Sequence, residues 1–169
     1  MTPKKEWKDA GYVTEPVDKN LNLKEEIRRL CKEKDAIILA HYYTVGDIQD
    51  IADFVGDSLA LARKASDTDA KVMVMCGVHF MAETCKLLSP DKTVLCPDLT
   101  AGCSLADSCD AADLRKYKAE HSGYQVVSYV NTTAAVKALT DVVVTSGNAV
   151  KVMESFPKDA KIIFGPDYN

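Results

Sequence analysis

The stretch AIILAHYYTVGDIQDIADFVGDSLALA, residues 36–62, begins with five apolar residues and continues through a polar turn into helical spacing. A short apolar run of this kind is typical of a buried β-strand, and the pattern after it predicts helices. A similar stretch, YQVVSYVNTTAAVKALTDVVVTSGNAV, follows 88 residues later at residues 124–150, with strand and turn positions in phase. Strands that alternate with helices predict a parallel sheet covered by helices, so the expected fold class is α/β.

Periodicity predicts the remaining elements in the same way. Helices are expected at residues 21–31, 48–54, 59–65, 80–88, 112–120, 133–139 and 149–156. Strands are expected at residues 36–40, 72–76, 93–95, 125–130, 142–144 and 161–164. The expected architecture is therefore a repeated three-layer αβα unit with a parallel sheet.

The two similar stretches share few identical residues, but the matches fall at equivalent places. The identical pairs are Thr44 with Thr132, Asp53 with Asp141, Val55 with Val143 and Ser58 with Ser146. With two further residues inserted, residues 69–72 align with residues 159–162, and each introduces an apolar strand. An internal repeat would explain why strands, turns and matching residues recur at this nearly constant offset. The alternative is that any two strand–helix units share such a pattern.

A repeat would divide the chain into three parts. Residues 1–35 would form an N-terminal arm and helix, and residues 36–123 a first α/β unit that includes the loop around Cys103. Residues 124–169 would form an incomplete second unit without counterparts of residues 82–123. The chain is therefore expected to be a fragment that holds the first unit and part of the second.

Composition excludes several classes of protein. The 169 residues carry a net charge of -4 in mixed-sign segments, which is unlike the basic surface of a nucleic-acid-binding protein. No apolar run approaches the roughly 20 residues of a membrane span, and the polar first 20 residues lack the apolar centre of a signal peptide. A cytoplasmic location is expected, with no nucleic-acid or membrane partner and with reduced cysteines.

Hydrogen-bonding side chains follow two of the predicted strands. His41, Tyr42 and Tyr43 end the first strand, and Tyr129 and Asn131 are the counterparts 88 residues later. Ligands of open α/β sheets bind beyond the carboxyl ends of the strands, where imidazole and phenol groups can transfer protons near neutral pH. A single histidine at a strand end is, however, more often structural.

Two predicted helix starts carry polar residues. Asp57 and Ser58 follow Gly56 and precede the helix expected at residues 59–65, and Ser146 precedes the helix expected at residues 149–156. The common role of such residues is to cap the helix. The alternative is that the helix N–H groups and the serine hydroxyls bind an anionic group of a ligand.

Six cysteines are present, and Cys103 is the best candidate for a metal ligand. It lies in the small-residue loop 98–109, where a thiol is expected to be exposed, and Cys109 in the same loop is the only rival. Cys31, Cys76, Cys85 and Cys96 fall within apolar segments and are expected to be core residues. One cysteine cannot hold a cluster, but a repeat would bring further cysteines to a common axis.

His79 and Glu83 lie four residues apart at the start of the helix predicted at residues 80–88. Two side chains at this spacing on a helix can bind a metal ion together. A surface pair or a supporting hydrogen-bonded pair is the more common outcome.

An ordered set of motifs carries a family resemblance. The motifs are LAHYY at 39–43, DIQDIAD at 47–53, GDS at 56–58, GVHFMAE at 77–83, AGCS at 101–104, YVNT at 129–132 and TSGNA at 145–149. Together they resemble the quinolinate synthase family from about residue 24 to residue 169.

The resemblance implies a fold, a cofactor and a reaction. It implies three similar α/β domains around a pseudo-threefold axis, with a [4Fe-4S] cluster held by one cysteine from each domain. It also implies a transferase of NAD biosynthesis that condenses iminoaspartate with dihydroxyacetone phosphate and dehydrates and cyclises the product to quinolinate. The open iron would act as a Lewis acid. L-Aspartate oxidase or aspartate dehydrogenase would supply the iminoaspartate.

The resemblance also implies roles for individual residues. Cys103 matches the first cluster ligand. His41, Tyr43 and Tyr129 match catalytic groups, and the substrate-binding residues would be His41, Tyr43, Asp57, Ser58, Tyr129, Asn131 and Ser146. The later cysteines of the family have no counterpart here, which puts catalysis by this chain alone in doubt.

Two other functions remain open on the residues themselves. The chain could be a non-catalytic α/β module that binds a dicarboxylate or another anion at its helix starts. A nucleotide-binding protein is disfavoured because no glycine-rich phosphate-binding motif follows a strand.

Overall fold

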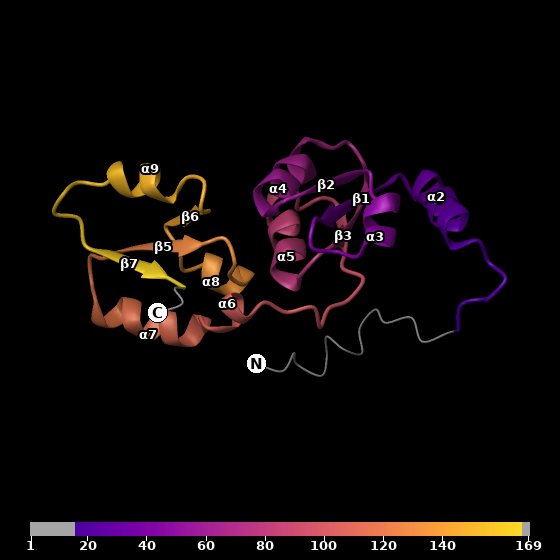
Figure 1. Ribbon diagram of the computed structural model, residues 1–169. Helices are drawn as coiled ribbons and strands as arrows, with labels where there is room; N and C mark the ends of the chain where they lie inside the picture. The colour runs from indigo at the N-terminus through magenta and orange to yellow at the C-terminus, as the bar shows by residue number, and fades with distance from the viewer. Residues whose placement is uncertain (1–15, 167–169) are drawn as a thin grey trace. The chain divides into compact units, whose positions relative to one another are not determined.

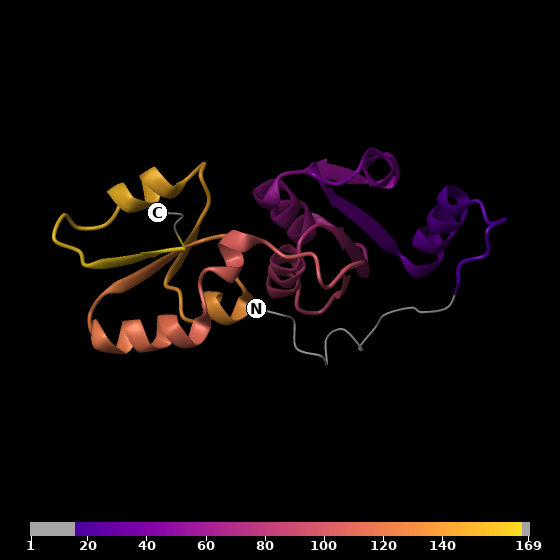
Figure 2. The ribbon, with the colours of Figure 1, turned by 60° about the horizontal axis from the view of Figure 1, so that its bottom comes forward.

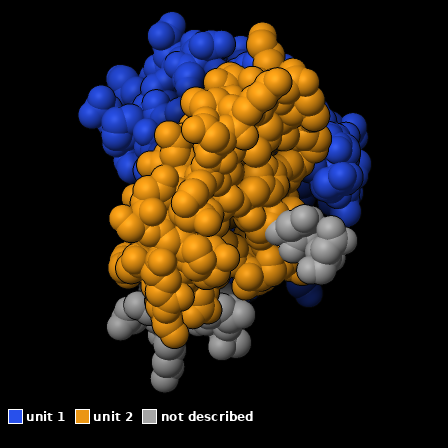
Figure 3. Space-filling model, turned by 90° about the vertical axis from the view of Figure 1, so that its left-hand side faces the viewer, with its two compact units in different colours: residues 1–101 blue, residues 102–169 orange. Residues whose placement is uncertain are grey.

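The computed structural model describes residues 16–166, which divide into two compact units between Ala101 and Gly102 (Figure 3). Each unit is described by itself. The first 15 residues of the expected N-terminal arm lie outside the described part of the chain.

Unit 1 is an α/β unit with a parallel sheet (Figure 1). Its strands lie in the order β2-β1-β3-β4, so the first strand of the sequence is an inner one. Figure 2 shows α4 and α5 next to each other beside this sheet. The elements are α2 Leu23–Lys34, β1 Ala36–His41, α3 Gly46–Ile51, β2 Phe54–Gly56, α4 Ser58–Asp67, β3 Val72–Cys76, α5 His79–Leu88 and β4 Thr93–Leu95.

Unit 2 has a second parallel sheet, with strands in the order β6-β5-β7. Figures 1 and 2 show α7 and α9 on opposite sides of this sheet, which gives the expected αβα layers. The elements are α6 Ser104–Asp107, α7 Ala111–Glu120, β5 Gln125–Tyr129, α8 Ala134–Lys137, β6 Val142–Val144, α9 Ala149–Glu154 and β7 Ile162–Gly165. Across residues 16–166, no helix combines the length and apolar character needed to cross a membrane.

The division between the units lies earlier than the repeat predicted. It falls between Ala101 and Gly102 rather than after residue 123. The reason is that Leu114 of α7 is buried against Val126 of β5 and Val136 of α8. The division therefore falls within the loop 98–109, and Cys103 belongs to unit 2.

Two elements differ from those that the periodicity of the sequence predicts. The helix expected at residues 48–54 ends at Ile51, and Phe54–Gly56 form β2 instead. The Asp53 N–H donates to the Ile38 carbonyl at 2.9 Å, so the chain leaves the helix and joins the sheet. The loop 98–109 also contains a short helix, α6, which the sequence pattern did not indicate.

The strand pairings of the two sheets match at the predicted offset. Leu39 pairs with Phe54 in unit 1, and Val127 pairs with Val142 in unit 2, which is an offset of 88 residues for both strands. Ile37 pairs with Met73 where Gln125 pairs with Ile162. The next paired strand of unit 2 therefore comes one residue later in the chain than the 88-residue offset gives. The sequence comparison predicts two extra residues before this strand, and that prediction is wrong.

An aspartate fixes the start of the central strand in both units. The carboxylate of Asp53 accepts a hydrogen bond from the Ile38 N–H at 2.8 Å, and that of Asp141 accepts one from the Val126 N–H at 2.7 Å. The backbone N–H of each aspartate in turn donates to the backbone carbonyl of that strand residue, Ile38 for Asp53 and Val126 for Asp141. The match between Asp53 and Asp141 in the sequence thus has a structural cause.

Candidate functional site

The strand-end residues of unit 1 lie together as expected. His41 ends β1 beside Gly56, the last residue of β2, and only 8% of His41 is exposed. Its Nδ1 accepts a hydrogen bond from the Tyr43 N–H at 3.3 Å. In this arrangement the proton of the neutral ring is on Nε2, which can donate to a ligand oxygen.

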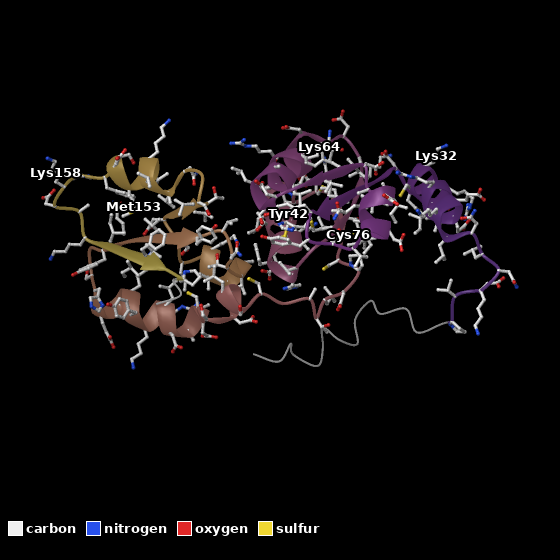
Figure 4. The ribbon with its side chains drawn as sticks, in the orientation of Figure 1. Lys32, Tyr42, Lys64, Cys76, Met153 and Lys158 are labelled. Atoms are coloured by element: carbon white, nitrogen blue, oxygen red, sulfur yellow. The ribbon has the colours of Figure 1, made fainter. Side chains whose placement is uncertain are left out.

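Three aromatic rings gather at this end of β1. The ring of His41 lies 4.5 Å from the rings of both Tyr42 and Tyr43, and the two tyrosine hydroxyls are 3.1 Å apart. Tyr42 is labelled in Figure 4. Tyr43 is 80% exposed, so its phenol is available to a ligand.

Asp57 has the capping role that was weighed for it in the sequence. It is the N-cap of α4, and its carboxylate accepts from the Ala60 N–H at 2.8 Å. Ser58 is the first residue of the helix and is half-buried. A ligand role for Asp57 and Ser58 stays a prediction.

Unit 2 brings Tyr129 and Ser146 together. Tyr129 ends β5, and its hydroxyl is 2.5 Å from the hydroxyl of Ser146. Ser146 does not lie at a helix start as expected, because α9 begins at Ala149 and has Asn148 as its N-cap. Asn148 instead closes a turn by accepting from the Thr145 N–H at 2.7 Å, and this turn presents Ser146.

Cys103 contacts another predicted site residue of unit 2. The Asn131 Nδ2 group donates to the Cys103 sulfur at 3.6 Å. Cys103 is half-buried and immediately precedes α6. An N–H donor directed at a partly accessible sulfur suits a thiolate ligand of a metal cluster.

The other cysteines are poor candidates for metal ligands. Burial raises the pKa of Cys76 (labelled in Figure 4) and of Cys85 to about 11. Cys109, the rival of Cys103, packs against the hydrophobic core of unit 2, and burial with Asp110 and Asp113 nearby raises its pKa. Since the thiolate is the metal-binding form, a raised pKa opposes ligation.

His79 and Glu83 form the pair that their spacing predicts, with 3.9 Å between the imidazole and the carboxylate. Within residues 16–166, no group of three or more histidine, cysteine or acidic side chains is arranged to hold a metal ion. The contact between His79 and Glu83 is therefore confirmed, and its role stays a prediction.

Replacing His41 by glutamine is expected to flatten the pH dependence of folding stability between about pH 7 and pH 5. Burial lowers the pKa of His41 from its ordinary value of 6.5, and the nearby Asp57 carboxylate opposes this only in part. The unfolded chain then binds a proton that the folded chain does not, so the free energy of unfolding falls as pH drops below 6.5. Urea unfolding followed by circular dichroism at both pH values measures this. An equal loss of stability in the variant would contradict it.

Two side chains outside the predicted set contact these strand ends. Gln49 of α3 and Lys137 of α8 donate hydrogen bonds to backbone carbonyls in the turns after β1 and β5. Gln49 and Lys137 are different residue types, so a comparison of the two similar stretches for identical residues does not identify them.

The chain is similar to one protein family along most of its length. The model of the family described as quinolinate synthetase A protein matches residues 25–169. The quinolinate synthase of Chloroherpeton thalassium is 56% identical over 161 residues, which cover 95% of this chain and 50% of that protein.

Other relatives give the same result. The quinolinate synthase of Trichodesmium erythraeum is 58% identical over 88% of this chain and 46% of its own length. That of Rippkaea orientalis is 59% identical over 85% of this chain and 44% of its own length. The chain thus spans about half the length of the curated relatives that it matches.

Proposed function

The chain belongs to the quinolinate synthetase A protein family, and we propose that it supplies part of the active site of a quinolinate synthase. In the proposed reaction, iminoaspartate condenses with dihydroxyacetone phosphate, and loss of phosphate and water with ring closure gives quinolinate for NAD biosynthesis. An aspartate-oxidising enzyme, L-aspartate oxidase or aspartate dehydrogenase, would provide the iminoaspartate in the cytoplasm. The observation that carries the proposal is the identity of 56–59% to named quinolinate synthases over 85–95% of this chain.

The strand-end geometry supports recognition of carboxylate and phosphate oxygens. His41 can donate from Nε2, and the exposed phenol of Tyr43 and the hydroxyl of Ser58 lie on the same unit. Hydrogen bonds from neutral donors near a helix start stabilise an anion without requiring a nearby arginine. These groups would hold the dicarboxylate part of the substrate.

Unit 2 supports a role in proton transfer. The hydroxyls of Tyr129 and Ser146 are 2.5 Å apart, so a proton can pass between them and a bound substrate oxygen. Asn131 lies two residues after Tyr129, and its side-chain N–H can donate to an oxygen of the triose-derived part of the substrate. Tyr43, Tyr129 and His41 are therefore the proposed catalytic groups, and Ser146 a proposed ligand for phosphate or carboxylate.

Cys103 is the residue proposed to ligate an iron–sulfur cluster. Its half-buried sulfur and the Asn131 donor 3.6 Å away fit a thiolate ligand, whereas the pKa of Cys109 is raised by burial. When bound, a [4Fe-4S] cluster with an open iron would supply Lewis-acid polarisation of a substrate hydroxyl or nitrogen.

Titration of the isotope-labelled chain with quinolinate, followed by NMR, tests the proposal. We expect chemical-shift changes concentrated at His41, Tyr43 and Ser58 and at Tyr129, Asn131 and Ser146. Pyridine-3,5-dicarboxylate, which carries the same charge without adjacent carboxylates, is the matched control and should cause much smaller changes. Equal chemical-shift changes with both isomers, or changes centred on other residues, would contradict the proposal that these residues bind quinolinate.

A further inference from the structure

The turn after β1 is held by one side chain that reaches back from α3. The Gln49 Nε2 group donates to the Tyr42 carbonyl at 3.0 Å and to the Thr44 carbonyl at 2.7 Å. These two carbonyls lie on either side of Tyr43 in the chain. Thr44 adds a bond from its hydroxyl to the His41 carbonyl at 2.8 Å.

The turn after β5 is held in the same way by a different residue. The Lys137 ammonium donates to the Val130 carbonyl at 2.9 Å and also to the Thr132 carbonyl. These carbonyls lie on either side of Asn131. The Thr132 hydroxyl donates to the Tyr129 carbonyl at 3.0 Å, as Thr44 does to His41.

Each position in this arrangement has its counterpart 88 residues away. Gln49 corresponds to Lys137, the paired carbonyls of residues 42 and 44 to those of 130 and 132, and Tyr43 to Asn131. Gln49 and Lys137 share the ability to donate two hydrogen bonds from one nitrogen, and they share little else. Two unlike residues that make the same pair of bonds indicate that the bonds themselves are required.

We propose that Gln49 and Lys137 are positioning residues that fix Tyr43 and Asn131 at the ligand-facing ends of the two sheets. This inference rests on the proposed function, because it assigns a purpose to the rigidity of these two turns. A side chain that binds a ligand must be held close to its bound position, and backbone freedom in its turn would weaken the interaction. Neither Gln49 nor Lys137 needs to touch the ligand.

The test compares removal of the donor with exchange of the donor. Gln49→Met and Lys137→Met keep the length of the side chain and remove both hydrogen bonds. Gln49→Lys and Lys137→Gln instead introduce the hydrogen-bond donor that the other unit has at the equivalent position. Lys86→Met is the matched control, because Lys86 bridges the Pro90 and Lys92 carbonyls at 2.7 Å each, outside either turn.

Two readouts are measured on the intact chain by NMR. Backbone order parameters at Tyr43 and Asn131 report the rigidity of each turn, and quinolinate titration reports affinity. Each methionine variant is expected to lower the order parameter of its own turn from roughly 0.85 towards 0.6 and to weaken quinolinate binding about tenfold. The exchanged variants should stay rigid and bind within about twofold of the original chain.

The outcomes separate the inference from the proposed function. If the methionine variants keep rigid turns, or if Lys86→Met weakens quinolinate binding as much as they do, the positioning role is refuted. Exchanged variants that behave like the methionine variants would also refute it. If the unaltered chain does not bind quinolinate, the proposed function fails, and the order parameters alone then decide whether Gln49 and Lys137 fix their turns.

Discussion

We expect copies of this chain to assemble a shared iron–sulfur cluster to which each contributes the Cys103 thiolate, and we expect replacement of Cys103 by serine to abolish this assembly. The serine oxygen is a poor ligand for iron in such clusters, which are held by thiolates. The other five cysteines cannot substitute because partial or full burial raises their pKa and favours the protonated form. The measurement is iron and sulfide content per chain, with the visible absorbance of the cluster, after anaerobic reconstitution. We expect complete loss in Cys103→Ser.

Cys109→Ser is the matched control for this experiment. Cys109 lies in the same loop and is half-buried like Cys103, but it packs against the core of unit 2. Its replacement should leave cluster content unchanged. Equal cluster content in Cys103→Ser and the unaltered chain would overturn the assignment. An unaltered chain that assembles no cluster would show that Cys103 needs thiolates beyond those of this sequence.

Asp53→Ala and Asp141→Ala are each expected to destabilise their own unit by about 2 kcal/mol, because each removes a charge-assisted hydrogen bond and leaves a strand N–H without its acceptor. Each carboxylate also pairs with a basic side chain, Arg28 at 2.7 Å for Asp53 and Lys118 at 3.5 Å for Asp141. Amide hydrogen exchange at Leu39 and Val127, which are fully buried and do not donate to these carboxylates, measures the stability of each unit separately.

Two controls separate the hydrogen bond from the charge. Asp53→Asn and Asp141→Asn keep an oxygen acceptor and should lose less stability than the alanine variants. Asp50→Ala removes an exposed ion pair with Lys24 at 3.4 Å and should change stability by less than about 0.5 kcal/mol. A loss in Asp50→Ala as large as that in Asp53→Ala would show that general surface charge, and not the strand bond, is responsible.

Much of the fold follows from the sequence because the central strands are short, uninterrupted apolar runs. Leu39 and Val127 are fully buried, and their strands lie where the runs predicted them. The parallel sheets and alternating helices were confirmed. The spacing of Phe54 from Ile48 and Ile51 fits a helical face and predicts a helix, but the hydrogen bonds of Asp53 bring this segment to the sheet.

The candidate site was predictable as residues but not as contacts. The positions of His41, Tyr43, Tyr129 and Asn131 follow from the rule that ligand-binding groups lie after the strands. The contact of Asn131 with Cys103 and that of Tyr129 with Ser146 join residues 28 and 17 positions apart, and only the folded chain shows them. Gln49 and Lys137 were missed because residue identity does not reveal a shared pattern of hydrogen bonds.

The two turns are alike in shape and unlike in electrostatic potential. Where unit 1 has the neutral Gln49, unit 2 has the cationic Lys137, and where unit 1 has the anionic Asp57, the corresponding residue of unit 2 is Thr145. At these two pairs of positions, unit 2 is therefore more positive than unit 1 by two charges. At these positions an anionic group is attracted more strongly to unit 2 than to unit 1, so two units that share a fold differ in the ligand charge that each favours.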